Sequence, residues 1–220
     1  MGNILIIGAS GHAKVIIDIV QQEGKHNVVG LLDPGLEVGA KVLGYPVLGT
    51  EEDLPTLIES HAIQGAIVAI GDNFTRAKVV EGVRAISPEL VFVSAVHPKA
   101  SMGLETSVGE GSVVMAGVAI NPCSSVGKFC IVNTNASLDH DSIMEDFSSL
   151  APGALTGGNC QIGQYSAVGA GAVLIQGIKV GEHTIIGAGS LLMSSVESFV
   201  TAYGTPAKTI RKREQGDKYS

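Results

Sequence analysis

The stretch "IGQYSAVGAGAVLIQGIKVGEHTIIGAG", residues 162–189, repeats a pattern every six residues. An apolar residue opens each unit, a glycine usually follows it, and a small residue usually stands four places on. The apolar series runs at the same spacing from Val96 to Leu192, and Thr156 is its one polar member. Such a period predicts a solenoid in which every face places one apolar side chain in a continuous inner stack.

The residues before this series follow a different pattern. Short β-branched runs alternate there with helix-like segments, the runs at 4–8, 28–33, 65–71 and 90–96 and the helices at about 11–23, 51–61 and 74–86. This alternation predicts a parallel sheet with helices on its faces. We therefore expect an α/β domain at 1–95, a solenoid at 96–193 and a carboxy-terminal tail at 194–220.

Composition narrows the classes of function. A net charge of −7 over 220 residues argues against binding a nucleic acid backbone or an anionic membrane. The first residues show neither a positively charged leader nor an apolar run long enough to span a bilayer, so a cytoplasmic protein is expected. Cys123, Cys130 and Cys160 lack the spacing of a zinc site, and we predict that they are small buried residues without a metal.

The loop "GASGHA", residues 8–13, follows a predicted strand and opens a predicted helix. Its backbone N–H groups would face an anion at the helix N-terminus, which favours a phosphate site at Gly11 and His12. Its spacing is GxxG, whereas NAD sites use GxGxxG, so NAD is disfavoured. Asp33 ends the second strand, where an acid can bind a ribose hydroxyl. The alternative is a plain turn in which Ser10 caps the helix.

His140 lies among carboxylates in "LDHDS", residues 138–142. If three units make one triangular coil, the residues stacked on His140 are Pro122 and Gly158. Glycine would leave a gap beside the imidazole for a reacting group. Histidine titrates near neutrality, so it can take a proton from an amine or hydroxyl and return one to a thiolate. The alternative is a lone surface histidine.

A carboxylate beside His140 would hold the imidazole in one tautomer. Asp141 is the first candidate, although neighbours in an extended strand point to opposite faces and the chain would have to turn between the two. Asp139 is the second candidate, and its alternative is a solvated surface charge. A backbone N–H near Gly158 would serve a developing oxyanion.

The units "VGKFCI", "IGQYSA" and "VGEHTI", with "IIGASGHAKV" before them and "YGTPAK" after them, carry a family resemblance. The chain resembles the sialic acid O-acetyltransferase and nucleotide-sugar N-acetyltransferase family of left-handed β-helix hexapeptide-repeat acyltransferases. The resemblance implies a Rossmann-like domain that holds a nucleotide sugar, a homotrimer, and acetyl-CoA bound between neighbouring subunits without a metal. The implied reaction is acetylation of the 4-amino group of a nucleotide-linked 4-amino-4,6-dideoxy sugar.

The same resemblance assigns residues to roles. It makes His140 the general base, with Asp141 in the family's acidic position. The implied substrate-binding residues are Gly11, His12, Asp33 and Asn133. The implied acetyl-CoA-binding residues are Gly158, Ala167, Ala170, Gly187 and Ala188. At the end of the chain, Lys208, Arg211, Lys212 and Arg213 would either meet the phosphates of coenzyme A or belong to a frayed tail.

Three other functions compete with this one. An O-acetyltransferase of sialic acid or another sugar hydroxyl would use the same base and donor. A zinc hydratase resembling the gamma-type carbonic anhydrases needs three converging histidines, and His140 is the only histidine among residues 98–182. A non-catalytic trimeric scaffold would leave His140 without a role.

Overall fold

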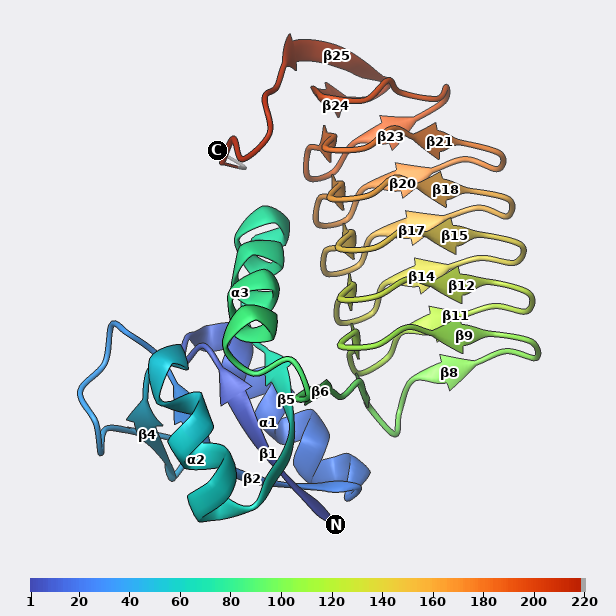
Figure 1. Ribbon diagram of the computed structural model, residues 1–220. Helices are drawn as coiled ribbons and strands as arrows, with labels where there is room; N and C mark the ends of the chain where they lie inside the picture. Colours follow the sequence, from blue (N-terminus) through green and yellow to red (C-terminus); the bar gives the residue numbers. More distant parts are fainter. Residues whose placement is uncertain (219–220) are drawn as a thin grey trace.

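The computed structural model describes residues 1–218, which form an α/β domain beside a tall triangular β-helix (Figure 1). The α/β domain lies against the lower half of the β-helix, and helix α3 runs up alongside its coils. The chain begins in the α/β domain, and residues 213–218 lie above this domain, near the top of helix α3.

The α/β domain is built on a six-stranded sheet in the order β3-β4-β2-β1-β5-β6. Its strands are β1 (Gly2–Ile7), β2 (His26–Leu32), β3 (Lys41–Val42), β4 (Tyr45–Gly49), β5 (Ile63–Val68) and β6 (Val91–Phe92). Its helices are α1 (Gly11–Glu23), a 3-10 turn at Glu51–Asp53, α2 (Leu54–His61) and α3 (Asn73–Ile86). All neighbours pair in parallel except β3 and β4, which form an antiparallel hairpin.

Successive side chains of β1 point to opposite faces of the sheet, and different helices cover the two faces. Ile4 and Ile6 pack with α1 on one face, whereas Leu5 and Ile7 pack with α2 and α3 on the other. These β1 side chains are fully buried, as expected for a central parallel strand.

Two details of this domain differ from the prediction. The hairpin of β3 and β4 was not foreseen, because β3 has only two residues and gives no apolar run. The run at 90–96 is not one strand: β6 ends the first sheet, and β7 (Ala95–Val96) begins the β-helix.

The β-helix consists of two-residue strands that recur every six residues and pair in parallel with strands eighteen residues away. The first of its three sheets continues from β7 with β10 (Val113–Val114), β13 (Ile131–Val132), β16 (Ser149–Leu150), β19 (Ala167–Val168) and β22 (Ile185–Ile186). The second holds β8 (Ser101–Met102), β11 (Ala119–Ile120), β14 (Ser137–Leu138), β17 (Leu155–Thr156), β20 (Val173–Leu174) and β23 (Leu191–Leu192). The third holds β9 (Ser107–Val108), β12 (Ser125–Val126), β15 (Ile143–Met144), β18 (Gln161–Ile162) and β21 (Lys179–Val180).

The predicted inner stack is buried from Val114 to Leu192, including Thr156. It fails at the first coil, where Met102 is 39% exposed, because no coil lies beneath to cover it. Each buried aliphatic side chain contributes about 1.5–3 kcal/mol, so the stack is the main source of stability in this part of the chain.

One corner of the β-helix carries a column of stacked rings. Successive ring centroids lie 5.0, 5.3, 4.5 and 4.8 Å apart along the column. The members all have positive φ, and the first four are eighteen residues apart, whereas the last follows after sixteen: Phe129, Phe147, Tyr165, His183 and Phe199. Phe74 of α3 meets Tyr165 and His183 edge-on, so this corner faces the α/β domain.

Helix α3 is clamped to the same corner by two buried side chains. The Arg76 guanidinium donates to the backbone oxygens of Phe129 at 2.8 Å and Phe147 at 3.3 Å, and also to those of the Ile70–Gly71 loop. Asn73 accepts a further bond from Arg76 and donates to the Ser166 carbonyl at 3.0 Å. These bonds join the helix to three successive coils and fix the orientation of the two parts.

The segment predicted as a tail caps the β-helix. β24 (Val200–Gly204) pairs in parallel with β22, and β25 (Ala207–Lys212) returns antiparallel to it. The frayed alternative is therefore wrong for residues 200–212. Arg213 is buried, with its guanidinium donating to the Lys218 and Asp217 carbonyls, whereas Lys208, Arg211 and Lys212 are exposed.

We predict that Arg76→Met lowers the free energy of unfolding by about 3 kcal/mol or more, because it strips several buried carbonyl oxygens of their donor. Chemical denaturation measures this change. Arg84→Met is the matched control on the same helix: that side chain is half exposed, and its loss should cost less than about 1 kcal/mol. Equal stability of the two variants would contradict the clamp.

Candidate active site

His140 lies at the corner between β14 and β15, and its side chain is 49% exposed. The imidazole lies across Gly158, one coil further on: a Cβ added to that glycine would fall within 2.5 Å of His140 Nε2. Any larger residue at position 158 would displace the ring. The predicted gap beside the imidazole is therefore filled by the imidazole itself, and a reacting group has to approach the ring from its solvent side.

Asp141 is the carboxylate that contacts the ring. Its Oδ2 lies 2.7 Å from His140 Nδ1. The geometric objection to this neighbour disappears because Asp141 has a φ of +58°, a turn conformation that brings successive side chains to the same side. Asp139 instead accepts from the backbone N–H of His140 at 2.9 Å and from Asn121 Nδ2 at 2.5 Å.

These contacts set the protonation of both groups. The hydrogen bond that His140 donates to the Asp141 carboxylate raises the pKa of His140 above its ordinary value, and the charge of Asp139 adds to this effect. The bonds from Asn121 and from the His140 amide lower the pKa of Asp139. Because the Asp141 carboxylate accepts a hydrogen bond from Nδ1–H, Nε2 is left as the basic atom of the neutral ring.

A second candidate region is a cavity of 430 Å³ between the α/β domain and the sheet of β13, β16, β19 and β22. The carboxyl edge of the domain's sheet supplies His12 and Gly71 to its wall, as expected for a ligand site in an α/β fold. Five of the predicted binding residues line it: His12, Asn133, Ala167, Gly187 and Ala188. Ser149, which the sequence analysis did not single out, is a further polar lining residue.

His12 is neutral in this cavity. Burial, reinforced by the positive charge of Arg76, lowers the pKa of His12 to about 4. Its Nε2 is buried without a hydrogen-bond partner among residues 1–218. A buried polar atom left unpaired costs free energy, so a ligand that bonds to Nε2 would recover that cost.

The residues predicted to bind the nucleotide, Gly11 and Asp33, lie at the same carboxyl edge of the α/β sheet as His12, which lines this cavity. Ser10 precedes α1 without a side-chain capping bond, so the capping alternative is wrong, and an alanine-sized group added at Gly11 would meet no atom within 4 Å. Asp33 accepts from the backbone N–H groups of Ala9 at 2.7 Å and Gly35 at 2.8 Å. Asp33 thus holds the loop in shape as well as lying at the end of its strand.

The remaining predicted residues fall outside these groups. Ala170 is exposed at a neighbouring corner, one coil below Ala188, and does not line the cavity. Cys130 and Cys160 are buried, but Cys123 is exposed at the tip of a corner, so the prediction was wrong for Cys123. No group of side chains suited to a metal ion occurs within residues 1–218.

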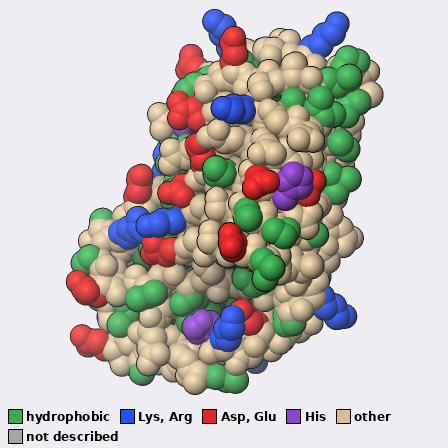
Figure 2. Space-filling model, turned by 90° about the vertical axis from the view of Figure 1, so that its right-hand side faces the viewer, with side chains coloured by type: hydrophobic (Ala, Val, Ile, Leu, Met, Phe, Trp, Pro, Cys, Tyr) green, Lys and Arg blue, Asp and Glu red, His purple; other side chains and the backbone are tan. Residues whose placement is uncertain are grey.

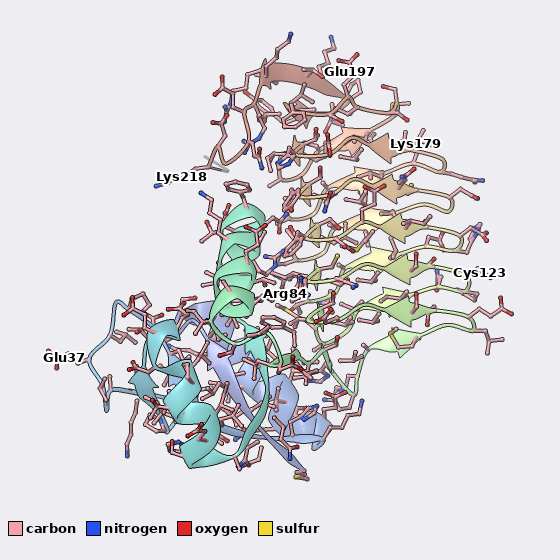
Figure 3. The ribbon with its side chains drawn as sticks, viewed as in Figure 1. Glu37, Arg84, Cys123, Lys179, Glu197 and Lys218 are labelled. Carbon is pink, nitrogen blue, oxygen red and sulfur yellow. The ribbon has the colours of Figure 1, made fainter. Side chains whose placement is uncertain are left out.

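The base and the cavity lie on different sides of the β-helix. Figure 3 labels Cys123 at the corner farthest from the α/β domain, and Asp141 lies one coil above it, because its N–H donates to the Pro122 carbonyl. Figure 2 looks onto this side of the molecule and shows apolar and acidic side chains exposed there. Within one chain, the imidazole therefore cannot reach a ligand seated in the cavity.

Comparisons with known proteins match both parts of the chain. Residues 3–83 match the family model of the PglD N-terminal domain, and residues 159–193 match that of the bacterial transferase hexapeptide. A mutant perosamine N-acetyltransferase from Caulobacter crescentus, solved with CoA and GDP-perosamine, is 36% identical with a TM-score of 0.90 over 96% of this chain and 98% of that one. The fold class predicted from the sequence is thereby confirmed.

Two further relatives are also acetyltransferases. The acetyltransferase domain of PglB from Neisseria gonorrhoeae FA1090, solved with acetyl coenzyme A, is 33% identical with a TM-score of 0.87 over 94% of this chain and 98% of that one. The UDP-N-acetylbacillosamine N-acetyltransferase of Bacillus subtilis (strain 168) is 32% identical over 53% of this chain. The match spans about half of that curated relative, 52% of its length.

We predict that Asp141→Asn lowers the pKa of His140 toward the ordinary value of about 6.5, because the carboxylate that stabilises the imidazolium is lost. An NMR titration of the histidine Cε1–H signals measures this, with His140→Ala identifying the signal. Asp146→Asn is the control, since that carboxylate binds Lys128 N at another corner and should leave the titration unchanged. An unshifted midpoint in Asp141→Asn would refute the contact.

Proposed function

The chain belongs to the family of nucleotide-sugar N-acetyltransferases that join a PglD-type domain to a hexapeptide-repeat β-helix, and from this premise we propose its reaction. It transfers the acetyl group of acetyl-CoA to the 4-amino group of a nucleotide-linked 4-amino-4,6-dideoxy sugar. The observation that carries the proposal is the His140–Asp141 pair on the β-helix, 2.7 Å apart, in a chain whose α/β domain has the form of a nucleotide-binding unit.

The relatives support this choice over O-acetylation. Those compared are named as N-acetyltransferases of perosamine and of UDP-N-acetylbacillosamine, or as an acetyltransferase domain. Two of the perosamine enzyme structures were solved with one histidine replaced, by asparagine or by alanine, in complex with CoA and GDP-perosamine. A single histidine base on the β-helix agrees with that choice of mutation.

The geometry assigns the proton transfers to His140. Nε2 of the neutral imidazole takes a proton from the attacking amine as the new C–N bond forms, and the C–S bond of the thioester then breaks. The imidazolium, stabilised by Asp141, returns that proton to the leaving thiolate. Gly158 is buried against the imidazole, and within residues 1–218 its N–H has no hydrogen-bond acceptor, so we propose this N–H as the donor to the developing oxyanion.

We assign the acetyl-CoA site to the small residues of the β-helix. Ala167, Gly187 and Ala188 line the cavity, Ala170 lies one coil below Ala188, and Gly158 lies one coil above His140, against its imidazole. Gly187 has no room for a side chain, because a Cβ there would lie 2.6 Å from Tyr203 Cβ. Lack of bulk at these positions lets a long thin ligand approach the backbone closely.

We assign the nucleotide sugar to the α/β domain, residues 1–95. Gly11 leaves space at the start of α1, where N–H groups favour a phosphate, and Asp33 lies at the end of β2. The unpaired Nε2 of His12 and the amide of Asn133 offer polar contacts within the cavity. The β-helix, residues 96–193, then carries the acetyl transfer.

We propose that the working site forms between subunits of a homotrimer. In one chain the base and the cavity lie on different sides of the β-helix, so a neighbouring subunit has to bring them together. Apolar side chains are available for such an interface around β17 and β20: Leu155, Val173 and Ile175 are 42%, 37% and 41% exposed. Burying them against a neighbour would stabilise the assembly.

We also propose a cytoplasmic location. The three cysteines are free, which agrees with a reducing compartment. Among residues 1–218, none of the helices has the length and apolar character needed to cross a membrane.

Thiol release from acetyl-CoA tests the reaction directly, with UDP-, GDP- and TDP-linked 4-amino sugars and free sialic acid as acceptors. We expect release with one amino sugar and a loss of about 100-fold or more in kcat for His140→Ala, the usual contribution of a general base. Release with sialic acid alone would favour the O-acetyltransferase. Absence of both release and coenzyme A binding would refute the acyltransferase.

Mixed trimers test the shared site. His140→Ala removes the base, and Ala188→Trp fills the cavity, so each variant alone should be inactive. Coexpressed in equal amounts, they should recover about one quarter of wild-type activity, because half of the subunits offer a base and half of their neighbours offer an open cavity. No recovery in a mixture that sedimentation shows to be trimeric would place the whole site within one chain.

A further inference from the structure

Thr156 is the one polar residue in the inner apolar series, and its side chain is buried at 7% exposure. A threonine in an otherwise aliphatic stack gives up apolar contact and has to satisfy its hydroxyl. It lies at the end of β17, one coil above the strand that leads into Asp139 and His140. This position suggests a role beyond packing.

The hydroxyl of Thr156 replaces a rung of the backbone ladder. In the same column of the β-helix, the residue after each strand donates its N–H to a carbonyl one coil on: Gly103 to Ile120, Asn121 to Leu138, Gly157 to Leu174 and Ile175 to Leu192, at 2.7–3.1 Å. Asp139 is the exception, because its N–H donates to Thr156 Oγ1 at 2.9 Å. Accordingly β14 and β17 pair at one residue, Ser137 with Leu155, whereas β11–β14 and β17–β20 pair at two.

The altered rung falls directly before the base. The Asp139 carboxylate accepts from the backbone N–H of His140 and from Asn121 Nδ2. The ladder resumes at the next residues, where Asn159 N donates to the His140 carbonyl at 2.9 Å. The irregularity is therefore confined to the peptide that sets the height of the imidazole over Gly158.

We propose that Thr156 is a positioning residue for the reaction: its hydroxyl shifts the Asp139–His140 peptide out of the regular ladder and so holds the imidazole over Gly158 and against Asp141. This inference rests on the proposed function, since His140 is taken as the base. It explains why the apolar period breaks at this one position.

The test compares three proteins. Thr156→Val keeps the shape and satisfies the apolar repeat but removes the hydroxyl, so the ladder can return to its regular carbonyl acceptor. Thr156→Ser keeps the hydroxyl and loses only a methyl group. We expect kcat to fall about tenfold or more in Thr156→Val, with KM for acetyl-CoA and for the sugar within twofold, because small displacements of a catalytic group are costly. Thr156→Ser should stay within about threefold of the wild type.

Stability separates positioning from folding. Thermal unfolding of Thr156→Val should occur at or above the wild-type temperature, because valine is the kind of residue that the inner stack otherwise uses. Lower activity in an equally stable protein is the expected result. A kcat of Thr156→Val within twofold of the wild type would overturn the proposal. If the valine variant does not fold, Thr156→Ala takes its place, with the same criterion.

An NMR titration makes the test independent of activity. The charged groups that act on the His140 ring are Asp139 and Asp141, and the residues stacked below and above it, Pro122 and Gly158, are uncharged. If Thr156→Val moves the His140 ring away from Asp141, the titration midpoint of the ring falls below the wild-type value. In Thr156→Ser the midpoint should equal the wild-type value. An unchanged midpoint in Thr156→Val overturns the proposal even if no acceptor sugar is found, whereas failure of the wild type to transfer acetyl counts against the proposed function alone.

Discussion

Hydrogen bonds between coils eighteen residues apart are the constraint on which the β-helix depends. Each two-residue strand is too short to hold its place alone, so the parallel rungs and the inner apolar stack have to agree in register at every coil. Corners are then forced to fixed positions, and residues one coil apart lie above one another. The ring column from Phe129 to His183 and the stacking of His140 on Gly158 both follow from this period.

Because the hydrogen bonds of the β-helix are so regular, the few places where they change are easy to recognise. The rung after β14 ends on a side chain instead of a carbonyl, and the residue that follows it is His140. Similarly, Arg76 and Asn73 donate hydrogen bonds to backbone oxygens at the corner that carries the stacked rings. These bonds place the carboxyl edge of the α/β sheet over the coils of β13 to β22. In both cases a few polar side chains, set on a repetitive backbone, fix the position of a candidate site.

The electrostatics of the two regions are opposite. His140 is half exposed and has a raised pKa, since carboxylates surround it. His12 is largely buried beside Arg76, and its pKa falls to about 4. The carboxylates favour the protonated form of the first ring, whereas the second ring stays neutral and can only donate or accept a hydrogen bond. One chain thus separates proton transfer from ligand recognition, and the proposed trimer brings them together.

The sequence alone determined the repeat and the α/β order apart from the β3–β4 hairpin, and it pointed to His140 as the base, because a six-residue period and a histidine among carboxylates are visible without coordinates. Only the tertiary structure decided whether Asp139 or Asp141 contacts the His140 ring. The contact depends on the positive φ of Asp141, which the residue type does not predict. The tertiary structure also decided that the imidazole covers Gly158 and that the base faces away from the cavity. Those facts depend on where corners point and how α3 docks, and long-range contacts set both.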